Sequence, residues 1–233
     1  MIIGNGMLAK AFQICDSCNI LIFASGISDS KQVNPVQCIR EENLLRSMIQ
    51  NHEDKLLIYF SSCSIENSNL SCDPYHIHKL NMEKLISSES KEYLIFRLPN
   101  IIGPVSNNSK TLLSFLVRNI NAGCQIDIWS GSVRNLIDIS DIVLISNYII
   151  EHKLYINEIV NIANPTNISI LNLIDIINIY FDKTLKYDFI ETDSEYLNIK
   201  YGKIEKIINI LNIKFDNSYI QNAMKKYYVK GSK

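Results

Sequence analysis

Three residues between positions 56 and 85 have the types needed to move a proton to a carbonyl or from an alcohol. Ser62 ends an apolar run, and Tyr75 and Lys79 stand at the start of a helical pattern. A tyrosine and a lysine four positions apart on a helix share one face, so both reach one ligand. An ammonium beside the phenol stabilises the phenolate and brings the pKa down from its usual ~10. A nearby serine hydroxyl can hold the substrate oxygen as charge develops on it.

The tyrosine–lysine spacing carries little information by itself. Chance supplies about one such pair in a chain of this composition, and a second pair, Tyr196 and Lys200, is indeed present. That pair has no glycine turn, serine strand or sheet ahead of it, whereas Tyr75 has all three. The assignment of Tyr75 as a catalytic acid therefore depends on the elements that must position it.

The first twelve residues, MIIGNGMLAKAF, predict a strand, a glycine turn and a helix. In the pattern G-x-G-x-x-A, Gly4 allows the tight turn and Gly6 allows close approach of a pyrophosphate. Ala9 lets the helix pack against the strand. The N–H groups at the start of such a helix are free to bind phosphate. A plain glycine turn is the alternative interpretation.

Strands and helices then alternate in a way that is typical of a parallel sheet covered on both faces. We expect strands at 19–26, 56–60 and 93–104, the last stopping at Pro99, and helices at 34–50 and 75–86. After Gly103 the pattern changes to mixed short elements. These are a helix at 111–122, a strand at 125–131, a strand from 133 that leads into a helix after Asp141, a strand at 158–164, a helix at 169–181 with Ser169 as N-cap, and one or two short helices after 203.

Taken in order, these segments resemble the extended short-chain dehydrogenase/reductase family, in its nucleotide-sugar epimerase, dehydratase and reductase branch. FASG resembles the strand end beside the cofactor, and REENLLRSMI resembles the helix whose asparagine, here Asn43, supports the active site. IYFSSCSI puts Ser62 at the family's catalytic position, and YHIHKLNMEKL matches its Tyr-x-x-x-Lys helix. FRLPNIIGP and VRNLIDISDIV resemble two substrate-side signatures, which together are more specific than the tyrosine motif.

The resemblance implies the following site. The catalytic residues are Ser62, Tyr75 and Lys79. The cofactor, NADP or NAD, contacts Gly4, Asn5, Gly6, Met7, Leu8, Ala24, Ser25, Gly26, Asn43, Lys79 and Pro99. The substrate contacts Ser62, Asn100 and Arg134. A surface arginine is the alternative for Arg134, and Arg97 suits structural pairing and substrate contact equally.

One departure from the family is large. Only about fifty residues separate the glycine turn from the serine strand, where relatives usually carry two further strands. The carboxylate expected about 20 residues after the glycines, which holds the adenosine ribose, is absent by this reading. Asp16 and Asp29 are nearby, but neither clearly ends a second strand. We therefore predict a Rossmann-like α/β fold, a doubly wound parallel sheet trimmed by about two strands, with a small α+β substrate-binding cap. Residues 1–103 would form the dinucleotide domain, joined by parts of 125–165, and residues 104–233 would mainly form the cap.

Metal binding is the weaker reading of the cysteines and histidines. Cys15 and Cys18 lack the second pair that a structural zinc site requires. Cys63, Cys72, His76 and His78 read better as residues flanking the active site, with His78 free to touch substrate or solvent. We expect no metal, and the scattered cysteines are expected to be thiols. Asp138 and Asp141 read as turn and helix-cap residues.

Bulk properties exclude several function classes. The net charge of −1 creates no field that would attract nucleic acid. No apolar stretch approaches the ~20 residues of a membrane span, and no export signal opens the sequence. We expect a cytoplasmic protein, with no membrane or nucleic-acid partner, that forms a homodimer as its relatives do through helices equivalent to 38–50 and 75–86.

The resemblance implies an NAD(P)-dependent enzyme acting on a nucleotide-activated sugar. The favoured reaction is reduction of a 4-keto-6-deoxy sugar nucleotide, or a related epimerisation, in the synthesis of surface-polysaccharide precursors. A non-catalytic dinucleotide-fold sensor or assembly protein with a trimmed cofactor site is the first alternative. A reductase of small non-sugar carbonyls is the second.

Overall fold

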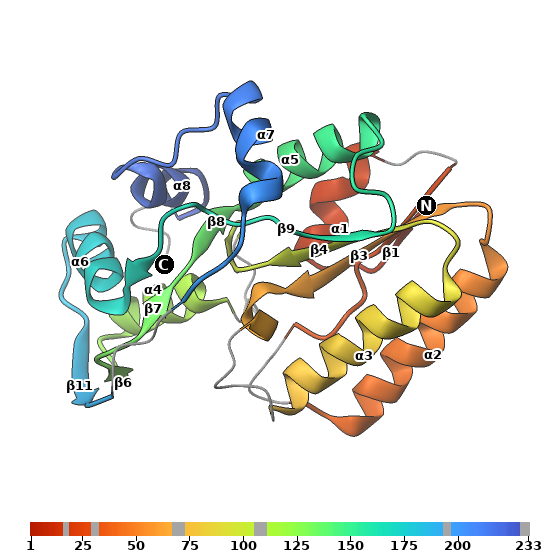
Figure 1. Cartoon of the computed structure of the whole chain (residues 1–233). Coiled ribbons are helices and arrows are strands. Elements are labelled where there is room, and N and C mark those ends of the chain that lie inside the picture. The colour runs from red at the N-terminus through yellow and green to blue at the C-terminus, as the bar shows by residue number, and fades with distance from the viewer. Residues whose placement is uncertain (16–18, 29–32, 67–72, 105–110, 193–196, 229–233) are drawn as a thin grey trace. The chain divides into compact units, whose positions relative to one another are not determined.

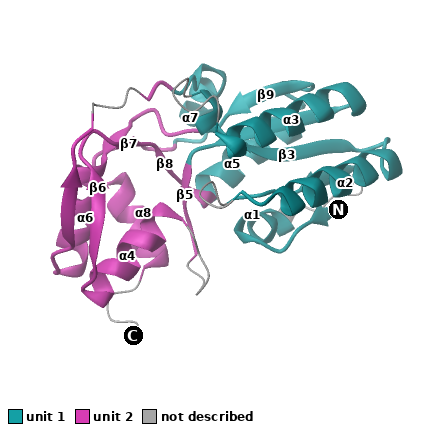
Figure 2. Ribbon diagram, turned by 90° about the horizontal axis from the view of Figure 1, so that it is seen from below, with its two compact units in different colours: residues 1–99, 140–162, 199–212 teal, residues 100–139, 163–198, 213–233 magenta. Residues whose placement is uncertain are grey.

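The computed structural model describes residues 1–15, 19–28, 33–66, 73–104, 111–192 and 197–228, without the side chains of 14 and 15. The chain forms two compact units (Figure 2). The first unit contains residues 1–99, 140–162 and 199–212. The second contains residues 100–139, 163–198 and 213–233.

The first unit is built on a five-stranded sheet in which every described pairing is parallel. Its order is β1 (Ile2–Ile3), β2 (Ile20–Phe23), β3 (Leu56–Ser62), β4 (Tyr93–Leu98) and β9 (Glu158–Asn161). The strand that precedes the glycine turn thus lies at an edge of the sheet. The Rossmann-like α/β fold predicted from the sequence is confirmed.

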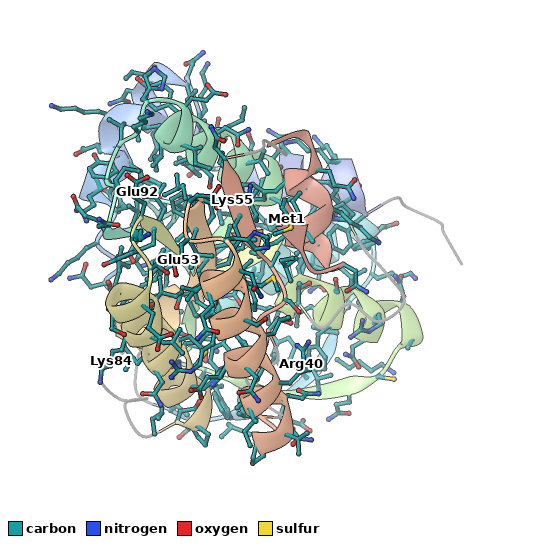
Figure 3. The ribbon with its side chains drawn as sticks, turned by 90° about the vertical axis from the view of Figure 1, so that its right-hand side faces the viewer. Met1, Arg40, Glu53, Lys55, Lys84 and Glu92 are labelled. Carbon is teal, nitrogen blue, oxygen red and sulfur yellow. The ribbon has the colours of Figure 1, made fainter. Side chains whose placement is uncertain are left out.

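Helices cover both faces of this sheet, as Figures 1 and 3 show. The pair α2 (Pro35–Asn51) and α3 (Pro74–Glu89) lie side by side on one face. The helices α1 (Met7–Ala11) and α5 (Ile139–Glu151) lie on the other. Alternate strand residues serve the two faces, since side chains of a strand point to opposite sides. Leu57 and Tyr59 pack with the α2 and α3 side chains, whereas Phe60 meets the ring of Phe12 at 5.0 Å on the other face.

Local signals explain where the two long helices begin. Proline occupies the first turn of each, and an Asx side chain precedes it. Asn34 Oδ1 accepts the N–H of Val36 at 2.9 Å. Asp73 Oδ1 accepts the N–H of Tyr75 at 2.8 Å and of His76 at 3.4 Å. The Asp73 cap therefore fixes the first turn of α3, which carries the predicted catalytic tyrosine.

The described part of the first unit also contains four short elements, and one helix start differs from the prediction. The short elements are η1 (Phe12–Cys15), η2 (Cys63–Glu66), η4 (Gly202–Ile204) and α7 (Glu205–Ile210). The helix expected after Asp141 begins at Ile139, so the prediction was wrong by two residues. Asp141 lies in the first turn of α5, where the N–H groups of the helix favour a carboxylate.

In its described residues, the second unit contains three two-stranded pairings and three helices. β5 (Asn100–Ile102) pairs with β8 (Leu136–Asp138), β6 (Gln125–Trp129) with β11 (Lys186–Ile190), and β7 (Val133–Arg134) with β10 (Ile168–Ser169). The helices are α4 (Leu112–Ala122), α6 (Ile170–Phe181) and α8 (Tyr219–Tyr227). Ser169 caps α6 as predicted, since its Oγ accepts the N–H of Asn172 at 3.2 Å. β11 was not predicted, although its sequence, KYDFI, alternates polar and apolar residues as a strand does. Its side chains are mostly exposed.

Candidate active site

The fold brings Ser62, Tyr75 and Lys79 together. Ser62 is the last residue of β3, and Tyr75 and Lys79 lie in the first two turns of the helix that follows it. The Ser62 side chain hydrogen-bonds the Tyr75 phenol. Lys79 Nζ lies 6.0 Å from the centre of the Tyr75 ring. The three predicted catalytic groups are therefore neighbours at the carboxyl end of the sheet, where open α/β sheets place their ligands.

Burial sets the protonation state of Tyr75. It raises the pKa of the phenol, and the charges of Glu41 and Asp73 raise it further, whereas the hydrogen bond with Ser62 lowers it. The result is a pKa of about 12. Tyr75 thus carries its proton at neutral pH, and its pKa is raised, not lowered as the sequence led us to expect from the neighbouring Lys79.

A buried carboxylate, Glu41 on α2, holds Lys79 in place. Lys79 is only 2% exposed, and its Nζ donates to Tyr59 Oη at 2.9 Å and to Glu41 Oε1 at 3.3 Å. Tyr59 Oη in turn donates to Glu41 Oε1 at 2.7 Å. Burial lowers the pKa of the Lys79 ammonium, and the negative charge of Glu41 acts in the opposite direction. Glu41 therefore helps to keep Lys79 charged.

The other oxygen of Glu41 is also fully engaged. Oε2 accepts the N–H of Ile27 at 2.7 Å and lies 2.9 Å from His78 Nε2. Burial alone would raise the pKa of Glu41, but the hydrogen bond with His78, the charge of Lys79 and the hydrogen bonds of Ile27 and Tyr59 outweigh it. They bring the pKa down to about 2, so this carboxylate is ionised at every physiological pH.

Glu41 was missed in the sequence, although a signal exists. It stands four residues before Leu45 and eight before Ile49, both buried, so it lies on the apolar face of α2. A charged residue on such a face needs a buried partner. Asn43, the residue proposed from the family resemblance, has an exposed side chain. His78, for which contact with substrate or solvent was considered, is buried against Glu41 instead.

The glycine turn and the end of β2 lie against each other. Gly4 has a φ of +128°, and a Cβ there would come 2.7 Å from the carbonyl carbon of Ala24, so only glycine fits. A Cβ on Gly6, the N-cap of α1, would meet nothing within 4 Å. A Cβ on Gly26 would come 2.8 Å from both Glu41 Oε1 and Lys79 Nζ. Gly26, which follows β2, therefore lies against Lys79, and Gly4 lies against Ala24 near the same strand end. The space beside Gly6 suits a phosphate group.

The remaining predicted cofactor residues lie in the same unit. Asn5 is exposed after the turn, and three others are half-buried: Met7 and Leu8 at the start of α1, and Pro99 after β4. Arg40 of α2, labelled in Figure 3, was not predicted. Its guanidinium donates to Ser25 O at 3.0 Å and to Ser25 Oγ at 3.4 Å, which sets a positive charge beside the predicted cofactor strand.

Comparison of the sequence with known protein families identifies one match. Residues 28–163 match the NAD dependent epimerase/dehydratase family, which is more than half of the sequence. The chain belongs to this family. The match includes Ser62, Tyr75 and Lys79 and begins after the glycine turn. No curated protein matches the sequence.

Solved structures of the same fold agree with this family. The UDP-N-acetylglucosamine 4-epimerase from Methanobrevibacter ruminantium has 18% identity and a TM-score of 0.66, over 93% of this chain and 77% of that one. The ADP-L-glycero-D-manno-heptose-6-epimerase from Helicobacter pylori has 16% identity and a TM-score of 0.64, over 89% and 72%. RMD from Pseudomonas aeruginosa, solved with NADPH, has 16% identity and a TM-score of 0.63, over 81% and 74%.

The two predicted substrate residues outside the first unit lie near one another in the second. Asn100 donates to the carbonyl of Asn135 through its backbone N–H at 3.1 Å and its side chain at 3.2 Å. Arg134, the residue before Asn135, donates to Val133 O at 2.8 Å and Ser132 Oγ at 3.2 Å. Arg97, by contrast, is paired inside the first unit with Glu83 at 2.6 Å and Glu66 at 3.2 Å, the structural alternative considered for it.

Some residues raised by the sequence cannot be placed. Asp16, Cys18, Asp29, Cys72 and Tyr196 lie outside the described residues, as does the side chain of Cys15. Within the described ranges, no three histidine, cysteine or acidic side chains gather as metal ligands would. The same ranges hold no helix with the length and apolar character of a membrane span.

Proposed function

We propose that this family member is an NAD(P)-dependent oxidoreductase or epimerase acting on a nucleotide-activated sugar. We infer that its reaction is reduction of a 4-keto-6-deoxy sugar nucleotide in the synthesis of surface-polysaccharide precursors. The observation that carries the proposal is the grouping of Ser62, Tyr75 and Lys79 beside Gly26, in a chain of the NAD dependent epimerase/dehydratase family.

Each residue has a defined task in this reaction. Gly4 and Gly6 shape the turn that would receive the pyrophosphate, and NADPH or NADH, when bound, supplies the hydride. Ser62 holds the substrate oxygen through a hydrogen bond that strengthens as negative charge develops. Tyr75 donates its Oη proton to that oxygen. Lys79, kept charged by Glu41, then stabilises the phenolate that Tyr75 becomes.

The contacts of Glu41 and Asp73 support a simple reduction over a dehydration. Elimination of water needs a further acid–base pair beside the substrate. Glu41 is buried and occupied by Lys79, Tyr59, His78 and Ile27, and Asp73 caps α3. Hydride and proton transfer require only the hydroxyl and ammonium groups already grouped at the site.

Nucleotide sugars are the substrates named for the similar solved enzymes of M. ruminantium and H. pylori. For this chain we propose that Asn100 and Arg134 contact the sugar nucleotide. We also propose that residues 104–233 mainly form its binding cap. A guanidinium can hold a diphosphate through two parallel hydrogen bonds, which suits Arg134 to that task.

The Tyr75→Phe variant tests the catalytic assignment. We expect kcat to fall by roughly 10²–10⁴-fold, because the general acid is lost while the ring and its packing remain. Tyr148→Phe, on α5 of the same unit, is the matched control and should keep its activity. Steady-state kinetics with sugar nucleotides and either reduced cofactor would measure both variants. Full turnover by Tyr75→Phe would refute the assignment.

A non-catalytic dinucleotide-fold protein remains the second candidate, and one observation favours it. The Lys79 ammonium, which would touch the cofactor, is 2% exposed and already has two partners. Fluorescence titration with NADH and NADPH, each with and without a sugar nucleotide, separates the two candidates. Saturable binding supports the enzyme, and no binding under any of these conditions supports the second candidate.

A further inference from the structure

A second chain of hydrogen bonds leaves the candidate active site from Ser62. Ser62 Oγ lies 2.7 Å from Ser64 Oγ, and Ser64 Oγ lies 2.8 Å from His76 Nε2. The other ring nitrogen of His76, Nδ1, lies 3.3 Å from Asp73 Oδ1. The His76 side chain is 6% exposed and that of Asp73 is 34% exposed. The chain thus connects the interior of the site with a carboxylate that water can reach.

The number of protons at each atom links the two ends of this chain. Ser62 Oγ already accepts the backbone N–H of Ser64 at 3.2 Å, and each serine hydroxyl has one proton to donate. If His76 Nε2 donates to Ser64, Ser64 must donate to Ser62, and the Ser62 proton is left for Tyr75. If Nε2 accepts, every hydroxyl turns the other way. Whether His76 Nε2 carries a proton therefore determines the direction in which the Ser62 O–H bond points.

The Nδ1 atom of His76 is suited to exchange protons. It is buried and makes no hydrogen bond of regular geometry within the described structure. Asp73 Oδ1 is close enough to stabilise a proton that arrives there, and it is itself fixed by the N–H groups of Tyr75 and His76. The edge of the Tyr75 ring packs against the imidazole, with ring centres 5.6 Å apart. Tyr75 and His76 are thereby held in one rigid helical turn.

The alternative exit, through Lys79, leads only to buried groups. Glu41, Tyr59, His78 and Lys79 are all less than a tenth exposed, and the described hydrogen bonds of the Lys79 ammonium end on Glu41 and Tyr59. Of the two sets of hydrogen bonds, only the one through Ser64 and His76 ends beside a partly exposed group, the carboxylate of Asp73. The hydrogen bonds around Lys79 therefore suit the holding of charge, and those from Ser62 through Ser64 to His76 suit the exchange of a proton.

We propose that Ser64 and His76 form a proton relay that returns a proton to Tyr75 after it has protonated the substrate. This inference rests on the proposed function. The Tyr75 phenolate takes the Ser62 hydroxyl proton, Ser62 takes that of Ser64, and Ser64 takes the Nε2 proton of His76 while Nδ1 takes a proton from solvent water beside Asp73. One N–H bond is broken at His76 and one O–H bond is formed at Tyr75. The ring, left with its proton on Nδ1, flips before the next turnover and so presents an N–H to Ser64 again.

The kinetic test uses Ser64→Ala, His76→Gln and the double variant. The glutamine amide can still donate to Ser64 but cannot pass a proton on, so a merely structural role of His76 would survive in it. We expect each single variant to lose roughly 10–100-fold in kcat and to show a larger solvent deuterium isotope effect. The double variant should lose no more than either single variant, because both interrupt one path. His152→Gln, at the exposed position directly after α5, is the control and should match the wild type.

A wild-type rate and isotope effect in His76→Gln would overturn the relay. Nitrogen-15 NMR of labelled histidine reads the connection without turnover. Ser62 makes no described contact with His76. The Ser62→Ala substitution should nevertheless shift the His76 ring resonances through Ser64 and leave those of His152 unchanged. Unchanged His76 resonances would also overturn the relay. Shifted resonances in a protein that turns over no sugar nucleotide would instead refute the proposed function and leave the connection standing.

Discussion

At the scale of single residues, Glu41 explains how an ammonium can be buried beside the candidate catalytic tyrosine. Moving a charge out of water is costly unless it is paired and hydrogen-bonded. Glu41 meets this need by accepting from Lys79, Tyr59 and Ile27 and by contacting His78. The pairing also fixes the place of Lys79 under the Tyr75 ring. We therefore regard Glu41 as a positioning residue for Lys79.

The low pKa of Glu41 predicts an acid-dependent contribution to stability. Because the pKa falls from 4.5 to about 2 on folding, ionised Glu41 stabilises the fold above pH 4.5. This stabilisation is lost as the pH drops towards 2. We expect Glu41→Gln to lower the free energy of unfolding at pH 7 by about 3 kcal/mol. The gap from the wild type should narrow between pH 4.5 and 2.

Urea denaturation across this pH range measures the effect. Glu151→Gln, at the exposed end of α5, is the matched control and should follow the wild-type curve. If the free energies of unfolding of the wild type and of Glu41→Gln differ by the same amount from pH 4.5 to pH 2, Glu41 is not the titrating group.

At the scale of elements, the turn between β1 and α1 separates two uses of glycine. Gly4 needs its left-handed backbone and its contact with Ala24, so it serves the fold. A Cβ on Gly6 would meet no neighbouring atom, so the fold does not require glycine there and the space is open to a ligand. The first role belongs to the packing of β1 on β2, and the second belongs to the proposed cofactor.

Two alanine variants test this separation. Gly4→Ala should destabilise the protein by about 2 kcal/mol, because both the backbone and the Ala24 contact are strained. Gly6→Ala should leave the melting temperature close to that of the wild type, while the added methyl blocks close approach of a phosphate and weakens NAD(P)H binding at least tenfold. Calorimetry and fluorescence titration measure the two effects. Equal losses of stability in both variants would contradict the assignment.

At the scale of the whole molecule, the central sheet ends at β1. In a doubly wound dinucleotide fold, the strand after the first βα unit carries the acidic residue that selects NAD over NADP. Here the described neighbour of β1 is β2, which runs into the Ala24–Gly26 segment. The cationic Arg40 lies beside that segment. The described residues thus offer a turn for the pyrophosphate and little that distinguishes the two adenosine riboses.

This arrangement predicts weak discrimination between the cofactors. We expect the dissociation constants of NADH and NADPH to differ by less than about tenfold, since the carboxylate that would repel the 2′-phosphate has no counterpart on β2. Arg40→Ala should weaken NADPH binding more than NADH binding, because the phosphate carries the extra charge. Fluorescence titrations of both proteins provide the measurement. A preference of more than a hundredfold in the wild type would contradict this prediction.

The sequence alone determined the order of the strands and helices in the first unit and the family. Glycine turns and apolar periodicity act within a few residues, so Gly4 and the helix at 34–50 could be interpreted directly. Similar local evidence selected Tyr75 over Tyr196. The start of α5 was missed by two residues, because strand and helix signals overlap between Leu136 and Asp141.

Only the tertiary structure decided which groups surround the proposed catalytic residues Ser62, Tyr75 and Lys79. Glu41 and Lys79 are 38 positions apart, and Ser64 and His76 are 12 apart. Such pairs depend on how α2 and α3 pack against β3, which no local pattern specifies. A glutamate or histidine in an amphipathic helix looks like a surface residue until packing removes water from it. Burial then makes its partner energetically necessary, and this is why the Glu41 network and the Ser64–His76 chain became visible only in the folded protein.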